Sequence, residues 1–289
     1  MHDTPPYRRI GIIGTGRVAQ AMALALHAHS VDPMLVWGRT PTRRDAITAR
    51  IGHSAPAQDL AQIASACDLI LIAVSDDAIA PIVAALAEQR PTGAPLILHL
   101  SGRSGAAILT PLAQRGALTA AVHPAMTFTG DPDREVARMI GARFVVTGST
   151  RPATGAAERL VALIGGVVEH VAEAQRALYH AALCHAANHL VTLMAGSCDA
   201  LATAGIADPA ALLAPLVRAA LDNSLDRGIG GLSGPLLRGD ADTIRDHLAA
   251  ISAHSPRLLP AYRAMATATL DALEQCGAPA SLSIRRILT

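Results

Sequence analysis

Polar side chains recur at helical spacing in the second half of the chain. His180, Cys184 and Asn188 follow one another at intervals of four residues, which places them on one face of a helix. His185 and His189 point away from that face. A histidine can protonate a carbonyl oxygen as a hydride arrives, and an asparagine amide can hold a carboxylate or the developing alkoxide. His180 and Asn188 are therefore candidate catalytic residues.

The same spacing also has structural explanations. A histidine bonded to the backbone and an asparagine that joins two helices would produce an identical pattern. A metal site built on His180 and Cys184 would lack further ligands at a suitable spacing, so we expect no metal.

The chain contains no lysine, and its permanently cationic side chains are all arginines. Schiff-base chemistry, a lysine-dependent P-loop and a lysine proton donor are therefore excluded. Arginine cannot act as the proton donor instead, because its pKa is far above neutral pH. The proton must come from a histidine, a carboxylic acid, a tyrosine, a cysteine or water.

A glycine-rich turn near the N-terminus separates an apolar run, residues 8–13, from an alanine-rich helical pattern, residues 18–29. Its sequence is Gly14-Thr15-Gly16-Arg17-Val18-Ala19. This spacing is typical of dinucleotide-binding turns, in which the first glycine permits the turn and the second lets the backbone approach a pyrophosphate. The N–H groups that open the helix would face the phosphates. We therefore expect a nicotinamide dinucleotide as cofactor.

The residues after the second predicted strand, 34–37, distinguish the two nicotinamide cofactors. NAD is held there by a carboxylate, whereas NADP is held by cationic and hydroxyl groups around its 2′-phosphate. The chain has no acid at this place but offers Arg39, Thr40, Arg43 and Arg44. Arginines in the first turn of a helix oppose its macrodipole, so a bound phosphate explains them better than solvation does. The sequence therefore favours NADP (NADPH).

Strand and helix patterns alternate through the first half of the chain. Strands are predicted at residues 8–13, 34–37, 69–74, 96–100, 117–122, 144–147 and 167–171, and helices at 18–29, 78–88 and 153–164. Such alternation predicts an α/β fold with a doubly wound (Rossmann), mostly parallel sheet. Ligands bind outside the carboxyl ends of such strands. Val74, Ser75 and Ser101 are therefore expected beside the binding crevice with His123, although the two serines also fit ordinary turns.

Helical patterns alone continue from residue 173 to the C-terminus, with interruptions at 208–209 and 228–235. We therefore predict two domains, an NADP-binding Rossmann domain at 1–172 and an all-α domain at 173–289 for substrate binding and dimerisation. The apolar helices of the second domain are expected to bury surface against a second subunit, which predicts a homodimer.

A glycine-rich block near residue 234 is the candidate substrate-binding segment of this helical domain. Ser233 can donate to a substrate carboxylate, and Arg238 can clamp it with two hydrogen bonds. Asp240 either orients Arg238 or caps the helix that begins near Ala241, and capping is the favoured role. Asn223, on the preceding helix, is a further pocket candidate. An ion pair between Arg238 and Asp240 alone is the structural alternative.

Composition excludes several classes of protein. A formal net charge of +1 and 2% aromatic residues offer neither a general field nor stacking platforms for nucleic acid. No apolar stretch is long enough to span a bilayer. The four cysteines show neither metal spacing nor a small-domain disulfide framework. We therefore expect a soluble, cytoplasmic protein without nucleic-acid or membrane partners.

With these motifs the chain resembles the bacterial Rossmann-like oxidoreductases that carry a C-terminal domain of unknown function numbered 2520. The resemblance covers nearly the whole chain and is strongest in its last block. It rests on the N-terminal fingerprint, on Leu100-Ser101-Gly102, on His123-Pro124 with Phe128, on Tyr179-His180 with Asn188, and on Leu232-Ser233-Gly234-Pro235-Leu236-Leu237-Arg238-Gly239-Asp240 followed by His247-Leu248.

The family is similar to ketopantoate reductase, pyrroline-5-carboxylate reductase and prephenate dehydrogenase. The resemblance implies NADP-dependent reduction of a small carboxylated 2-keto substrate, with 2-dehydropantoate (ketopantoate) as the first choice. Relatives often carry lysine where Arg176 stands, and if that lysine is their proton donor, His180 or His123 is its natural replacement here. The alternatives are a cyclic-imine reductase of the pyrroline-5-carboxylate type and an NADP-binding sensor without catalysis.

Overall fold

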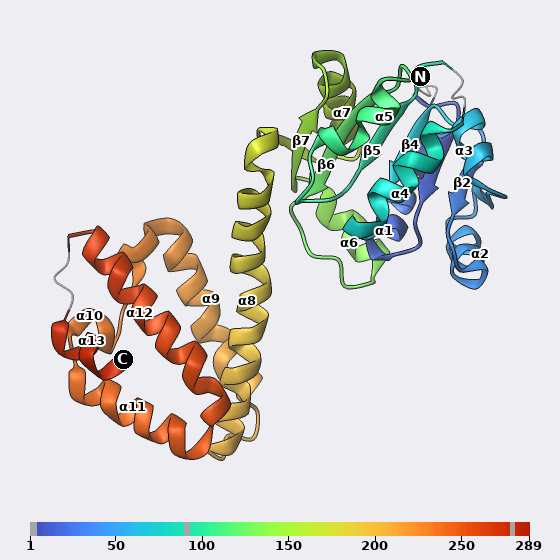
Figure 1. Cartoon of the computed structure of the whole chain (residues 1–289). Coiled ribbons are helices and arrows are strands. Elements are labelled where there is room, and N and C mark those ends of the chain that lie inside the picture. Colours follow the sequence, from blue (N-terminus) through green and yellow to red (C-terminus); the bar gives the residue numbers. More distant parts are fainter. Residues whose placement is uncertain (1–4, 90–92, 278–280) are drawn as a thin grey trace. The chain divides into compact units, whose positions relative to one another are not determined.

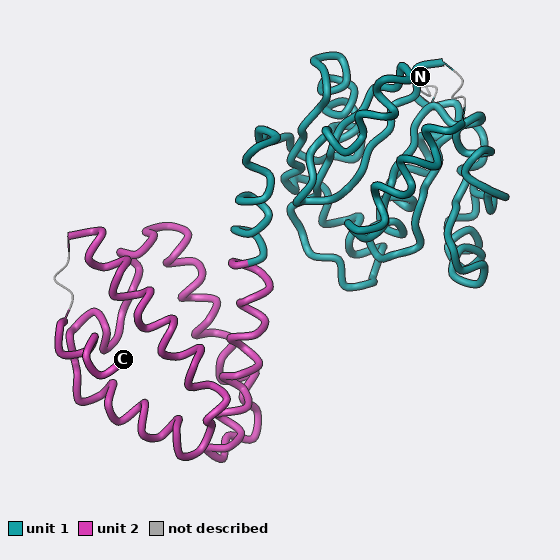
Figure 2. Tube along the Cα trace, in the orientation of Figure 1, with its two compact units in different colours: residues 1–184 teal, residues 185–289 magenta. Residues whose placement is uncertain are grey.

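The structure, a computed structural model, describes residues 5–89, 93–277 and 281–289. The chain divides into two compact units, residues 1–184 and residues 185–289, which Figure 2 shows in different colours. The first unit is built around an eight-stranded sheet, and the described part of the second consists of helices.

The sheet of the first unit has the strand order β3-β2-β1-β4-β5-β6-β7-β8. The first six strands in this order run parallel, β7 is antiparallel to β6, and β8 is parallel to β7. This confirms the predicted doubly wound, mostly parallel sheet. The strands are β1 (Ile10–Ile13), β2 (Met34–Trp37), β3 (Ser54–Pro56), β4 (Leu69–Ile72), β5 (Leu96–His99), β6 (Leu118–Pro124), β7 (Arg143–Gly148) and β8 (Val167–His170).

Helices cover both faces of the sheet, which explains why its central strands are apolar on both sides (Figure 1). Along β1, Ile10 and Ile12 enter one core cluster, whereas Ile13 enters the other. The first cluster is completed by α1 (Arg17–Leu26), α2 (Pro41–Ile51), α6 (Pro132–Met139) and α7 (Arg151–Leu163); the second by α3 (Leu60–Ala66), α4 (Asp76–Ala87), η2 (Ala106–Leu109) and α5 (Thr110–Ala113). A short helix, η1 (His27–His29), follows α1.

The strand order reverses between β1 and β4, so a crevice opens beyond their carboxyl ends. The chain leaves β1 through Gly14, leaves β4 through Ser75 and leaves β5 through Ser101. β6 ends beside them with His123 and Pro124. The fold therefore brings the ends of four strands to one edge of the sheet.

The second unit has a small core of its own. Ile244, Leu248, Ala266, Leu270, Ile284 and Leu288 form its buried cluster. Its helices are the later turns of α8 (Arg176–Thr203), α9 (Pro209–Arg227), η4 (Gly228–Gly231), α10 (Pro235–Arg238), α11 (Ala241–His254), η5 (Pro256–Leu258), α12 (Leu259–Gln275) and α13 (Leu282–Leu288). The predicted interruptions coincide with the start of α9, which the Asp208 side chain caps, and with the segment from η4 to α10.

The boundary between the units lies later than the predicted one after residue 172. A short helix, η3 (Glu173–Gln175), leads into α8, and the first turns of α8 belong to the first unit because the Arg176 side chain is buried there. The compact units therefore divide within α8, between Cys184 and His185.

Among the residues that the structure describes, no helix is both long and apolar enough to cross a membrane. The four cysteines are free thiols.

Candidate functional site

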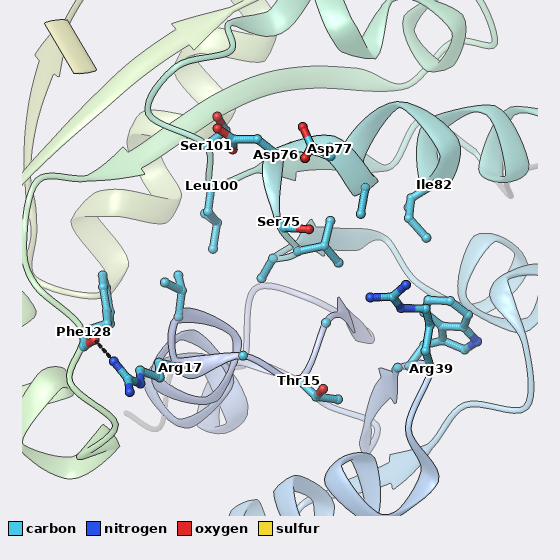
Figure 3. A pocket seen from close by; sticks show the side chains of 18 of the residues that line it. Thr15, Arg17, Arg39, Ser75, Asp76, Asp77, Ile82, Leu100, Ser101 and Phe128 are labelled. Atoms are coloured by element: carbon cyan, nitrogen blue, oxygen red, sulfur yellow. Dashed lines mark hydrogen bonds between the residues drawn. The ribbon is translucent and has the colours of Figure 1, made fainter. Parts of the chain in front are cut away.

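The crevice at the strand ends is a cleft of about 930 Å³ within the first unit. That volume is typical of sites that hold a sizeable small molecule. Figure 3 shows Arg17 and Arg39 on opposite sides of Thr15, with Ser75 and Ser101 facing them from the ends of β4 and β5. The cleft therefore has the glycine-rich turn as its floor.

The two glycines of this turn have different roles. Gly14 has a φ of 130°, and a Cβ there would lie 2.1 Å from the Ala73 carbonyl oxygen. At Gly16, by contrast, a Cβ would meet nothing within 4 Å and would occupy open cleft. Gly16 also precedes α1, whose first turn contains no acidic residue. The turn therefore offers open space and helix N–H groups to an anion.

Two guanidinium groups line the cleft beyond β2. Arg39 and Arg43 both border it, together with Thr40, which stands at the N-cap position of α2 without a capping side-chain bond. Arg44 does not border the cleft, and its guanidinium pairs with Asp45 at 3.2 Å. The cationic surface is therefore made by Arg39 and Arg43.

A loop from β6 to α6 closes the cleft beside Arg17. The Arg17 guanidinium donates to the Phe128 carbonyl oxygen at 3.4 Å (Figure 3). Glu135, only 1% exposed, holds the loop by accepting hydrogen bonds from the N–H groups of Thr129 and Gly130. Phe128 is thereby fixed as part of the cleft wall.

Two imidazole rings meet at the end of β6. His123 and His180 both line the cleft, with ring centroids 5.8 Å apart and an edge-to-face arrangement. Nδ1 of His123 lies 2.7 Å from the Tyr179 hydroxyl oxygen, and Nε2 of His180 lies 3.7 Å from Sγ of Cys184. The predicted helical face with His180 and Cys184 is therefore present, and it faces a second histidine from the sheet.

These groups are electrostatically coupled. Burial, together with the Arg176 guanidinium and His180, lowers the pKa of His123 to about 4 against the opposite effect of Asp76. Burial also raises the pKa of the Tyr179 hydroxyl, which Arg176 partly offsets. His123 is therefore neutral at pH 7, and an imidazolium acid at this position does not fit the structure.

Two buried polar side chains shape the loop between β5 and η2. Arg176 is 1% exposed and donates to the carbonyl oxygens of Ser101 and Gly102 and to Oγ1 of Thr147. His99 accepts the Ser101 N–H at Nδ1 and donates from Nε2 to the Gly105 carbonyl oxygen at 2.8 Å. Burial lowers the pKa of His99 to about 4, which keeps the ring neutral.

This loop presses against both imidazoles. A Cβ at Gly102 would lie 2.5 Å from Cδ2 of His180 and 3.0 Å from Nε2 of His123. Any side chain there would displace the rings, so the position requires glycine because of close approach.

The structure gathers most of the predicted residues of the first unit. Those that line the cleft are Gly14, Thr15, Gly16, Arg17, Val18, Arg39, Thr40, Arg43, Val74, Ser75, Ser101, His123 and His180. The Ser101 hydroxyl accepts the Ser104 N–H at 3.1 Å, so this serine also has the turn role considered for it.

Apart from Arg44, the other predicted residues lie in the second unit. Asn188 is exposed on α8, Asn223 lies on α9, and Ser233 lies between η4 and α10. Arg238 and Asp240 form an ion pair at 2.9 Å. The favoured capping role of Asp240 is wrong: it stands at the N-cap of α11 but makes no capping bond, because its carboxylate accepts from the guanidinium instead.

Sequence reasoning did not foresee the roles of Tyr179, His99 and Arg176. Tyr179 entered only as part of a motif shared with relatives. His99 ends an otherwise apolar strand, and Arg176 opens an apolar helix, so each was a polar residue in a buried context. Such residues need hydrogen-bond partners, and that need was the available signal.

Comparison with known families gives two matches. Residues 3–124 match the family described as a Rossmann-like domain, and residues 142–269 match a domain of unknown function (DUF2520). No curated protein sequence matches the chain significantly.

Solved structures share the fold over nearly the whole chain. A protein from Bacteroides fragilis described as an NADP oxidoreductase is 19% identical, with a TM-score of 0.76 over 91% of this chain and 97% of the other. The imine reductase from Myxococcus stipitatus, solved with NADP⁺, is 17% identical, with a TM-score of 0.70 over 97% and 100%. The reductive aminase from Aspergillus terreus, solved with NADPH and ethyl-5-oxohexanoate, is 19% identical, with a TM-score of 0.68 over 96% and 97%. At this identity the likenesses establish the fold.

Proposed function

Because the chain combines a Rossmann-like domain with a DUF2520 domain, we propose that it is an NADP-dependent oxidoreductase that reduces a C=O or C=N bond in a small carboxylated substrate. The observation that carries this proposal is the cleft itself. One cleft joins a dinucleotide-type turn, the two arginines Arg39 and Arg43 and a pair of imidazoles at the strand ends. The fold, which is also that of NADP-binding reductases, is consistent with this assignment.

The residues of the cleft fit NADPH. The open space at Gly16 and the N–H groups of α1 suit a pyrophosphate, and Arg39 and Arg43 suit the 2′-phosphate of the adenosine ribose. When bound, this cofactor supplies a hydride from its nicotinamide ring. The chain must orient the substrate and deliver a proton at the same place, and the imidazoles of His123 and His180 are the polar groups positioned to do so.

Ketopantoate is the first substrate that we propose, on the strength of the family resemblance set out above. The purified protein should oxidise NADPH when ketopantoate is added, which the loss of NADPH absorbance measures. Absence of turnover between pH 6 and pH 8, a range that is roughly neutral, would reject this substrate.

A cyclic imine is the second candidate, because two of the structures that share the full length of the fold act on imines or by reductive amination according to their descriptions. An iminium substrate already carries the proton that a ketone needs. Turnover of 2-methyl-1-pyrroline that survives His123→Ala and His180→Ala would favour it. Tight NADPH binding without oxidation by keto acids, hydroxy acids or imines would instead indicate a sensor.

We further propose that two copies of the chain associate through α9 and the later turns of α8. On α9, Leu216 is 66% exposed and Leu225 is 76% exposed, and the two lie on opposite faces of the helix. A helix that is apolar on opposite faces is typical of a buried helix. Val191 on α8 is 70% exposed as well. A second copy is the simplest cover, since most soluble oligomers are homo-oligomers. Sedimentation equilibrium should give twice the mass of the chain, and a monomer at micromolar concentration would contradict the proposal.

A further inference from the structure

The proposed reduction requires a proton, and the neutral state of His123 restricts where that proton can originate. His123 borders the cleft, but burial holds its pKa near 4, so it has no spare proton at neutral pH. A neutral imidazole can give up the proton on one nitrogen only if its other nitrogen receives a replacement. The group bonded to that second nitrogen therefore decides whether His123 can act as an acid.

We propose that Tyr179 and His123 form a proton relay, in which the Tyr179 hydroxyl protonates Nδ1 of His123 while Nε2 of His123 protonates the substrate. The Tyr179 hydroxyl oxygen lies 2.7 Å from Nδ1, a normal distance for an O–H···N hydrogen bond. Tyr179 does not border the cleft, whereas His123 does. A proton from the Tyr179 hydroxyl would therefore reach the cleft through the ring of His123.

The contacts of His123 leave Nε2 for the substrate. Nδ1 is engaged by Tyr179, and in the proposed relay the phenol donates to it, which places the ring proton on Nε2. Nε2 lies 3.0 Å from the position that a Cβ of Gly102 would take, and glycine leaves that position empty. The loop therefore approaches the ring without covering this nitrogen with a side chain.

Arg176 completes the relay by stabilising the phenolate that forms when Tyr179 gives up its proton. Its guanidinium carbon lies 6.0 Å from the centre of the Tyr179 ring. Its hydrogen bonds go to two carbonyl oxygens and one hydroxyl, and among the described residues no carboxylate lies within ion-pair distance of it. Glu173 acts on the guanidinium electrostatically but forms no ion pair with it among the described residues, and a phenolate is the anion that the relay would place beside it.

The step balances in atoms and electrons. For a ketone, hydride adds to the carbon of the C=O bond, and the π-electron pair moves onto the oxygen, whereas an iminium already carries its proton and needs no relay. The ketone oxygen takes the proton from Nε2, Nδ1 takes the proton from the Tyr179 hydroxyl, and the resulting phenolate regains a proton from water after the product leaves. In this step Arg176 stabilises the phenolate and does not itself donate a proton.

The chain supplies a matched control for this relay. Nδ1 of His247 lies 2.8 Å from the Tyr262 hydroxyl oxygen, and the two rings are edge-to-face with centroids 6.0 Å apart. This pair has almost the same geometry as His123 and Tyr179 but lies on α11 and α12, with His247 exposed and Tyr262 half-buried, and neither residue lines the cleft. Tyr179→Phe and Tyr262→Phe therefore remove the same hydroxyl in two contexts.

The first test needs no substrate, so it separates the relay from the proposed function on which it rests. In the full-length protein with ¹⁵N-labelled histidine, the His123 resonances, assigned with His123→Asn, should show the neutral Nε2–H tautomer from pH 6 to pH 8, a roughly neutral range. Tyr179→Phe should shift this ring toward a mixture of tautomers, and Tyr262→Phe should leave it unchanged. A His123 that titrates near its ordinary pKa, or that carries its proton on Nδ1, would overturn the relay.

The second test uses NADPH with ketopantoate and with 2-methyl-1-pyrroline. Tyr179→Phe should lower kcat for the ketone by about 100-fold, within the range of general acid catalysis, and leave KM almost unchanged. The loss should be much smaller for the imine, which binds as its protonated iminium. Wild-type kcat for the ketone in Tyr179→Phe, or an equal loss in Tyr262→Phe, would refute the relay. Absence of turnover by the wild-type protein would refute the proposed function, and the resonances of His123 would then decide the relay alone.

Discussion

The two units of the chain differ in how far they complete their own cores. In the first unit, helices cover both faces of the sheet, and every residue of β1, β4 and β5 is buried. In the second unit, six residues form the buried cluster, and α9 has no buried residue. Helices on both faces bury the apolar surface of the sheet within the first unit, whereas the apolar side chains of α9 stay exposed in the single chain. The first unit therefore buries its own apolar surface and contains the cleft, whereas the described part of the second unit leaves the apolar side chains of α9 exposed, which is why we propose that a second copy covers them.

The largest effect should come from disrupting the proposed contact between two copies through α9. Leu216→Glu combined with Leu225→Glu should weaken self-association by about 1000-fold, since burial of each leucine contributes about 2 kcal/mol. Sedimentation velocity over a dilution series measures the change. Ile140→Glu is the matched control, because Ile140 is 74% exposed but lies in the first unit. Equal weakening by this control would contradict the comparison between the units.

A substitution in the core of the first unit should act independently of protein concentration. Leu71 is fully buried at the centre of the sheet, so Leu71→Ala should lower the free energy of unfolding by about 2–5 kcal/mol. Trp37, the single tryptophan, lies at the end of β2 and reports the unfolding of this unit in urea. The midpoint should not change on dilution. A concentration-dependent midpoint at Trp37 would show that the first unit also depends on association.

Cofactor binding should belong to the first unit alone. Arg39→Ala with Arg43→Ala should weaken NADPH binding by about 100-fold, because two charge-assisted hydrogen bonds are lost, and should leave NADH binding unchanged. Calorimetric titration measures both. Arg44→Ala is the matched control, since Arg44 pairs with Asp45 and does not border the cleft. If the double variant Leu216→Glu with Leu225→Glu loses NADPH binding, the cofactor site is not contained in the first unit.

A smaller effect is expected from the buried His99. Its pKa falls from 6.5 in the unfolded chain to about 4 in the folded one, so between these values the unfolded chain binds the extra proton. Stability should therefore be lost as the pH falls through this window, by about 2 kcal/mol between pH 7 and pH 5. His99→Gln should reduce this loss in urea unfolding, whereas the exposed His53→Gln should not. An unchanged pH dependence in His99→Gln would mean that other groups cause it.

The sheet could be predicted because local patterns determine it. The strand at residues 34–37 was predicted with its observed bounds, since an apolar run ends there at Gly38. β3 was missed because three residues, Ser54–Pro56, carry no alternation. The cleft was also foreseen, because parallel strands bring their carboxyl ends together whatever their side chains are.

The contacts at the closed end of the cleft could not be predicted in the same way. Arg176 binds carbonyl oxygens about 75 residues away in sequence, and backbone acceptors leave no mark on the sequence. The bond from His123 to Tyr179 spans 56 residues and depends on how α8 meets the end of β6. For Asp240, local capping preference favoured a role that the neighbouring guanidinium overrides.

α8 is a single helix of 28 residues that carries Arg176, Tyr179 and His180 in its first turns and continues into the second unit. Helix formation is cooperative, so the stability of those first turns is linked to that of the turns that follow. If two copies associate as proposed, a dissociated protomer would keep every atom of its cleft, but it would hold Tyr179 and His180 on a helix whose ends fray more readily.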